Sequence, residues 1–66
     1  MDREQYFSAF KLAIEEEQKA YELYSTLAEM STDPETKKIF EQFARDELEH
    51  KRKLMDRYAK LKGEAP

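Results

Sequence analysis

The stretch Ser31-Thr32-Asp33-Pro34-Glu35 divides a chain of 66 residues almost at its midpoint. Asp33 is a preferred N-cap residue, and Pro34 then occupies the first helical position, where its missing N–H costs nothing. On both sides of this stretch Ala, Leu, Glu, Lys and Gln dominate, and these residues favour helices. The sequence therefore predicts an all-α hairpin of two helices and a turn, at about residues 3–30, 34–62 and 31–33.

The outer ends of the two predicted helices carry end signals. Asp2 is followed three residues later by Gln5, which predicts a capping box at the start of the first helix. Gly63 follows Lys60 and Lys62, and a glycine after basic residues is typical of a helix C-terminus. We therefore expect the second helix to end before Gly63.

Each predicted helix carries an apolar stripe with the three-and-four spacing of an amphipathic helix. The stripe of the first helix comprises Tyr6, Phe10, Ala13, Ile14, Ala20, Tyr21, Tyr24, Leu27 and Ala28. The stripe of the second comprises Ile39, Phe40, Phe43, Ala44, Leu54, Tyr58 and Leu61. Glu17 interrupts the first stripe, and Glu47 and His50 interrupt the second. A short turn pairs residues whose numbers sum to about 64, which places Glu17 opposite Glu47 and Tyr6 opposite Tyr58.

A two-helix hairpin cannot bury two such stripes by itself. We expect a second copy to pack against it and to complete an antiparallel four-helix bundle, a homodimer. A two-fold axis that crosses the helices at their middle would bring Glu17, Glu47 and His50 of both copies to one level. The dimer core would then hold four carboxylates and two imidazoles.

Four negative charges in an apolar core repel one another and are poorly solvated, and two divalent metal ions would cancel them. Glu47-Leu48-Glu49-His50 is a Glu-x-x-His motif, whose spacing puts both ligands on one helix face. Di-iron carboxylate bundles combine this motif with a single Glu from a facing helix, here Glu17. The ligand set predicts iron, one ion per chain and two per dimer, with manganese or zinc as substitutes.

The same three residues allow two other interpretations. The polar layer could only fix the register of a structural dimerisation hairpin, as a polar layer does in a coiled coil. Alternatively, a zinc ion could staple the bundle without any turnover. A further group of apolar residues lies away from both stripes and favours a larger homo-oligomer. Its members are Leu12, Leu23, Met30, Leu48, Met55 and Ala59.

Composition excludes several classes of protein. The chain contains no Cys, which removes disulfide frameworks, thiol catalysis and cysteine-based metal sites. The formal net charge of −3 argues against nucleic-acid binding. No apolar run approaches the ~20 residues of a membrane span, and the first residues lack the pattern of a signal peptide. We therefore expect a soluble cytoplasmic protein.

Two segments resemble a known superfamily. Ala13-Ile14-x-x-Glu17-x-x-Ala20-x-x-x-Tyr24 resembles the first helix of rubrerythrin-type and ferritin-like proteins, and Phe40-x-x-x-Ala44-x-Asp46-Glu47-x-x-His50 resembles their second helix. Ordinary members carry four helices in one chain. This chain looks like half of one, which is the layout of the two-helix encapsulated ferritins, whose ferroxidase site forms across a dimer interface.

The resemblance implies a role for each residue of the motif. Glu47 would bridge two metal ions, Glu17 and His50 would be terminal ligands, and Tyr24 would lie beside the ligands. It also implies a di-iron ferroxidase that oxidises Fe(II) with dioxygen or peroxide for iron storage or detoxification. A rubrerythrin-like reduction of peroxide is the alternative, and the lack of a Cys-rich electron-donor module favours the ferroxidase. An encapsulin shell is a further implied partner, although no docking tail is evident after Gly63.

Overall fold

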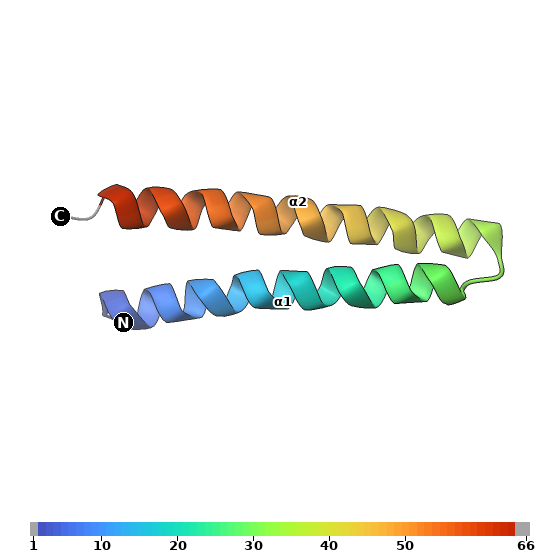
Figure 1. Cartoon of the computed structure of the whole chain (residues 1–66), viewed down its shortest axis with the longest axis horizontal. Helices are drawn as coiled ribbons and strands as arrows, with labels where there is room; N and C mark the ends of the chain where they lie inside the picture. Colours follow the sequence, from blue (N-terminus) through green and yellow to red (C-terminus); the bar gives the residue numbers. More distant parts are fainter. Residues whose placement is uncertain (1, 65–66) are drawn as a thin grey trace.

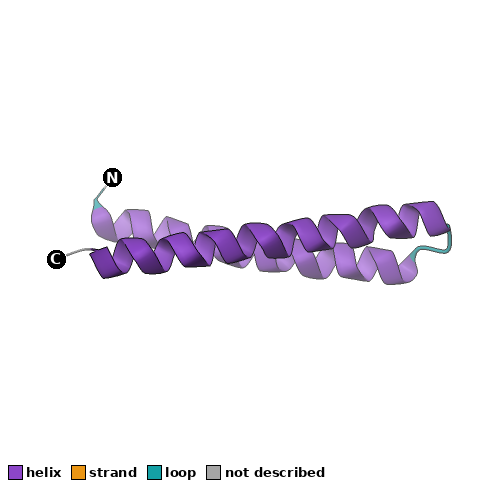
Figure 2. Ribbon diagram, turned by 90° about the horizontal axis from the view of Figure 1, so that it is seen from above, coloured by secondary structure: helices purple, strands orange, loops and turns teal. Residues whose placement is uncertain are grey.

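The computed structural model describes residues 2–64 and shows a helical hairpin (Figure 1). Helix α1 spans Arg3–Met30 and helix α2 spans Pro34–Glu64. The two helices are antiparallel. They lie side by side in Figure 1, and in Figure 2, seen from above, α2 crosses in front of α1 at a small angle. This confirms the prediction of an all-α hairpin. Neither helix is long and apolar enough to cross a membrane.

Side chains cap the start of both helices. Asp2 Oδ1 accepts the Gln5 N–H at 2.8 Å, while Gln5 Oε1 accepts the Asp2 N–H at 3.2 Å, which completes the capping box. At the turn, Asp33 Oδ2 accepts the backbone N–H and the hydroxyl of Thr36, each at 2.8 Å. The hydroxyl of Ser31 donates to the Leu27 carbonyl at the end of α1. These bonds satisfy backbone groups that a helix leaves free at its ends.

Gly63 does not end the second helix. Helix α2 continues through it to Glu64, two residues beyond the predicted end. No glycine has a positive φ, so Gly63 does not adopt the left-handed conformation by which glycine usually ends a helix. The last residues of the chain, Ala65 and Pro66, lie outside the described residues, and so does Met1. The question of a docking tail therefore falls mostly outside them.

Aromatic side chains fill the space between the helices near the chain ends. Phe7 is 7% exposed, and its ring packs edge-on against Tyr58 with the centroids 5.4 Å apart. Phe10 also packs against the Tyr58 ring, with the centroids 5.6 Å apart. The prediction that Tyr6 faces Tyr58 is therefore wrong. Consecutive residues of a helix are turned by ~100° from each other. This turn directs the Phe7 ring toward α2 and Tyr58, while Tyr6 stays 45% exposed.

The hairpin covers only one side of its apolar stripes. Ala28 and Ala44 are buried against the opposite helix. Ile39 and Phe43 remain 48% and 43% exposed, although both belong to the stripe of α2. The side chains of Leu12, Leu23, Met30, Leu48 and Met55 are also exposed. Many large apolar side chains therefore stay exposed to solvent when the hairpin is alone.

The cap at Asp33 predicts a pH effect on stability. The Thr36 hydroxyl and N–H hold the pKa of Asp33 below its usual value of 3.8. Because the folded state lowers this pKa, ionised Asp33 stabilises the hairpin above about pH 4, and this contribution is lost as the pH falls through the lowered pKa. Asp33→Asn keeps an acceptor for the Thr36 N–H but cannot titrate.

Thermal melts followed by circular dichroism from about pH 5 to pH 2 test this prediction. The wild-type melting temperature should fall more steeply with acid than that of Asp33→Asn, while the two proteins melt at similar temperatures near pH 7. Parallel curves over the whole range would mean that the cap does not contribute.

Candidate metal centre

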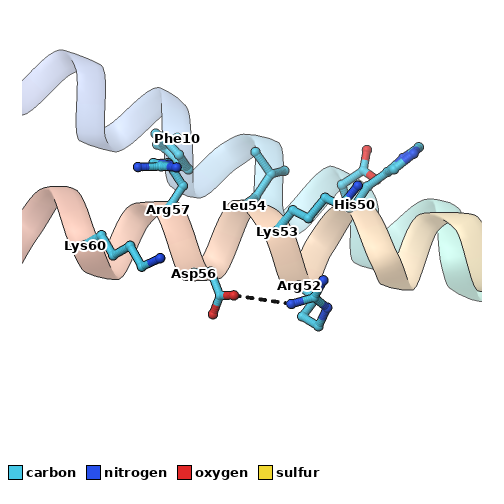
Figure 3. Close-up of a pocket in the computed structure, with 9 residues that line it drawn as sticks. Phe10, His50, Arg52, Lys53, Leu54, Asp56, Arg57 and Lys60 are labelled. Carbon is cyan, nitrogen blue, oxygen red and sulfur yellow. Dashed lines mark hydrogen bonds and ion pairs between the residues drawn. The ribbon is translucent and has the colours of Figure 1, made fainter.

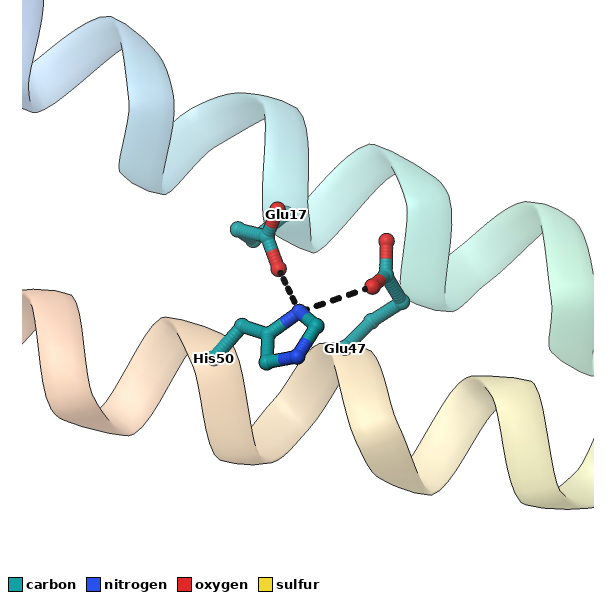
Figure 4. Close-up of side chains that lie close together, drawn as sticks. All are labelled: Glu17, Glu47 and His50. Carbon is teal, nitrogen blue, oxygen red and sulfur yellow. Dashed lines mark hydrogen bonds and ion pairs between the residues drawn. The ribbon is translucent and has the colours of Figure 1, made fainter.

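Three side chains meet between the helices at the middle of the hairpin (Figure 4). Glu17 comes from α1, and Glu47 and His50 come from α2. His50 Nδ1 lies 3.1 Å from Glu17 Oε2 and 3.1 Å from Glu47 Oε1. One ligand atom from each residue lies within 4.8 Å of the other two. The three residues therefore form a compact group of two oxygens and one nitrogen.

Helix geometry explains why these residues meet. Glu47 and His50 are separated by three residues, so they project from the same face of α2. Glu17 lies at the centre of the α1 stripe, with Ala13 and Ala20 one turn away on either side. The side chains of Glu17 and Glu47 are only 23% and 18% exposed, whereas that of His50 is 57% exposed. The carboxylates form the floor of the group and the imidazole lies on its open side.

The donor atoms fit a divalent cation. Nδ1 of His50 carries at most one hydrogen, so a single N–H faces two carboxylate oxygens. A metal ion in place of that proton would contact all three atoms. Two carboxylates and one imidazole suit iron or manganese, and zinc also accepts such ligands. Within residues 2–64, this is the group of three or more potential ligands that could hold a metal ion.

Two depressions flank the group of Glu17, Glu47 and His50 along the open face of the hairpin. The first, here called the turn-side hollow, is lined by Tyr24, Phe43, Asp46, Glu47 and His50. The second, the terminal-side groove, has a volume of about 620 Å³ (Figure 3). Phe10 and Leu54 supply its apolar lining. Its charged residues outside the metal group are the basic Arg52, Lys53, Arg57 and Lys60 and the acidic Asp56. On both sides, the group of Glu17, Glu47 and His50 therefore borders a depression that is lined by apolar and by charged side chains.

Residues around the ligands have different roles in the described structure. Tyr24 stacks on Phe40 with the ring centroids 6.2 Å apart and lines the turn-side hollow beside Glu47. Its hydroxyl forms no hydrogen bond with a ligand within the described chain, so its role beside the metal stays a prediction. Asp46 accepts a hydrogen bond from Gln42 Nε2 at 2.8 Å rather than from His50. Neither residue fixes the ligands directly here.

Glu49 lies between the two residues of the motif but points away from the group. Its carboxylate accepts hydrogen bonds from Arg52 at 2.6 and 3.1 Å. These bonds hold the pKa of Glu49 below its usual value, with smaller contributions from nearby positive charges. Glu49 therefore belongs to an exposed ion pair, not to the metal group.

One polar contact next to the ligands escaped sequence reasoning. Lys51 Nζ donates to Gln18 Oε1 at 2.6 Å across the helices. These two residues follow His50 and Glu17 directly in the sequence, so the contact runs beside the group and joins the same two turns. The position of Lys51 at the margin of the α2 stripe was the available signal, but Gln18 had no distinguishing pattern. The bond stabilises the register in which Glu17 faces His50.

Comparison with known proteins agrees with this geometry. The family model described as Rubrerythrin matches residues 2–65. No curated protein and no solved structure matches the chain. The single glutamate on one helix and the Glu-x-x-His on the other are the ligand pattern of di-iron carboxylate bundles, half of which one hairpin supplies. Because the match covers nearly its whole length, the chain belongs to the Rubrerythrin family.

Proposed function

We propose that the protein is a di-iron ferroxidase whose site is shared between two copies of the chain. The observation that supports this most directly is the convergence of Glu17, Glu47 and His50 in a member of the Rubrerythrin family. The family match supports a ferritin-like di-iron protein. Oxidation of Fe(II), a homodimer and a role in iron storage or detoxification are the finer parts of the proposal.

The ligand count supports a second copy. One chain offers three ligand residues for one ion. In a dimer with two ions, each ion would gain a fourth ligand residue if each Glu47 contacts both ions, and this sharing needs the second copy. Two copies would offer four carboxylates and two imidazoles. The four negative charges balance two Fe(II) ions, which removes the electrostatic cost of bringing the carboxylates together. The same pairing would cover the exposed parts of Ile39 and Phe43.

The residues of the chain favour the oxidised ion. Carboxylates stabilise Fe(III) more than Fe(II), because the attraction grows with the charge of the cation. Glu17 and Glu47 would therefore lower the energy needed to remove an electron from each bound Fe(II) substrate. Two Fe(II) ions supply two electrons, and dioxygen takes them with two protons to give hydrogen peroxide. By the resemblance to ferritin-like proteins, Glu47 would contact both ions.

The family match also favours a second candidate function, the reduction of peroxide. In that reaction hydrogen peroxide takes two electrons and two protons and gives two water molecules. The two activities differ in the preferred oxidant and in the fate of the iron. A ferroxidase releases Fe(III), whereas a peroxide reductase keeps its iron and needs an external electron donor.

Substitution of one ligand tests the metal site. Glu17→Gln removes the charge but keeps the shape of the side chain, and we expect it to weaken the binding of Fe(II) by more than tenfold. Anaerobic titration with Fe(II) should give one ion per wild-type chain. The matched control is Glu16→Gln, because Glu16 is exposed and pairs with Lys19 on the outside of α1. Equal binding by both variants would contradict the assignment.

Rapid mixing of the Fe(II)-loaded protein with air-saturated buffer, followed at near-ultraviolet wavelengths, tests the reaction. We expect ferric absorbance to rise much faster than in buffer with free Fe(II), and to rise no faster than that in Glu17→Gln. A faster reaction with hydrogen peroxide, with the iron retained, would favour the peroxide reductase. Binding of zinc without oxygen consumption, or stability that is independent of chelator, would leave a structural bundle.

A further inference from the structure

Charge is segregated along one edge of α2. Glu35, Asp46, His50, Lys53 and Arg57 lie within a narrow range of angles about the helix axis, because they are separated by 11, 4, 3 and 4 residues. Lys60 continues the same edge. Among these residues, those on the turn side of His50 are acidic, and those from Lys53 to Lys60 are basic. This edge is called the α2 edge below.

The α2 edge borders the open face on which the metal ligands lie. Asp46 lines the turn-side hollow together with Tyr24 and Phe43. Lys53 and Arg57 line the terminal-side groove together with Phe10 and Leu54 (Figure 3). In both depressions apolar side chains lie beside the α2 edge. The edge residue of the turn-side hollow, Asp46, is acidic, whereas those of the terminal-side groove, Lys53 and Arg57, are basic.

Apart from His50, which contacts Glu17 and Glu47, the charges of the α2 edge have no opposite partner within the part of the chain whose side chains are described. Lys53 and Arg57 form no ion pair there, in contrast to Arg52, which binds both Glu49 and Asp56. The carboxylate of Asp46 accepts a hydrogen bond only from the neutral amide of Gln42. The hairpin alone therefore leaves both halves of this edge uncompensated.

We propose that the α2 edge is the pairing surface between two copies of the chain and that its charges set the copies antiparallel. The proposal rests on the shared metal site proposed above and adds the residues that fix its geometry. A two-fold axis perpendicular to the helices, at the level between Glu47 and His50, lays α2 of one copy against α2 of the other. The acidic half of each edge then faces the basic half of its partner.

The spacing along the helix matches this arrangement. At 1.5 Å per residue, Asp46 lies about 4 Å from the axis level and Lys53 about 7 Å from it on the other side. The axis thus brings Asp46 to within about 3 Å, measured along the helix, of the level of the other copy's Lys53. Glu35 and Lys60 reach each other in the same way, again with an offset of about 3 Å. Four ion pairs follow from one axis.

The apolar residues match about the same axis. Phe43 and Leu54 lie at equal distances on either side of the level between Glu47 and His50, so Phe43 of one copy faces Leu54 of the other. Tyr24 and Phe10 lie equally far from Glu17 along α1. The turn-side hollow of each copy therefore sits on the terminal-side groove of its partner, with apolar surface on apolar surface and acid against base.

An axis parallel to the helices does not give this match. It would lay α2 of one copy against α1 of the other. Each residue of α2 would then lie at the same height as the α1 residue that it faces within its own hairpin. Facing residues in the hairpin have numbers that sum to about 66, as the contact of Phe7 with Tyr58 shows. Asp46 and Arg57 would then lie beside Ala20 and Ala9, and their charges would stay uncompensated.

Charge reversal on the whole chain tests the proposal. Lys53→Glu should raise the dissociation constant of the dimer by about tenfold or more, because it places two like charges together twice. The combined change Asp46→Lys and Lys53→Glu restores opposite charges and should bring the constant back to within about threefold of wild type. Lys38→Glu is the matched control, since Lys38 lies on the outer side of α2. Sedimentation velocity over a range of concentrations measures all four proteins.

Failure has a clear form in this experiment. If Lys53→Glu behaves like Lys38→Glu, if the combined change does not recover, or if wild type stays monomeric, the proposal is overturned. Iron binding is read separately from the Fe(II) titration. A dimer that binds one ion per chain but ignores the reversals would keep the proposed function and reject the pairing surface. A dimer that responds to the reversals but does not bind iron would support the pairing surface and reject the proposed function.

Cross-linking gives a second measurement that does not depend on affinity. The chain has no cysteine, so introduced thiols are the only ones present. In the double variant D46C/K53C, the two positions are about 10 Å apart within one chain, too far for an internal disulfide. Oxidation should give a covalent dimer if the copies are antiparallel. A protein that stays monomeric on non-reducing electrophoresis would overturn the proposal.

Discussion

Two carboxylates in the middle of an apolar interface are the constraint on which the rest of this molecule depends. Glu17 and Glu47 replace apolar residues in the stripes of their helices and are mostly covered by the hairpin. Burying such charges is unfavourable unless a cation or a hydrogen-bond donor compensates them. In the hairpin the compensation is one imidazole nitrogen between two oxygens. The helices therefore meet at this level through polar contacts and not through apolar packing.

The remaining features of the hairpin hold this level in register. Caps at Asp2 and Asp33 fix where each helix starts, and the hydrogen bond from Lys51 to Gln18 joins the helices beside the ligands. Phe7 and Tyr58 pack the helices together near the chain ends. A shift of α2 by one residue would turn Glu47 by ~100° away from Glu17. Precise register is therefore what turns three scattered polar residues into one site.

The fold and the convergence of Glu17, Glu47 and His50 could be predicted because both follow from local rules. Asp33 and Pro34 mark the turn, and the phase of the stripes singles out Glu17, Glu47 and His50 without any knowledge of packing. The error at Tyr6 arose because the adjacent residues Tyr6 and Phe7, in the first two turns of α1, are both aromatic. The spacing of the stripe alone does not decide which of the two faces α2. Gly63 misled for a similar reason: a glycine permits a helix to end but does not force it. The contact of Gln18 with Lys51 depends on side-chain reach across the helices, which no periodicity encodes.

The exposed fractions of Ile39 and Phe43 have a consequence for the folding of the chain itself. A hairpin 52 Å long and 13 Å thick has little interior, so much of its apolar surface can leave water only by association. In the proposed dimer, folding and assembly are one equilibrium, and the folded fraction depends on protein concentration by mass action. At low abundance such a chain is poorly protected from proteases, and at high abundance it protects itself. The amount of working site would then rise more steeply than in proportion to the amount of chain.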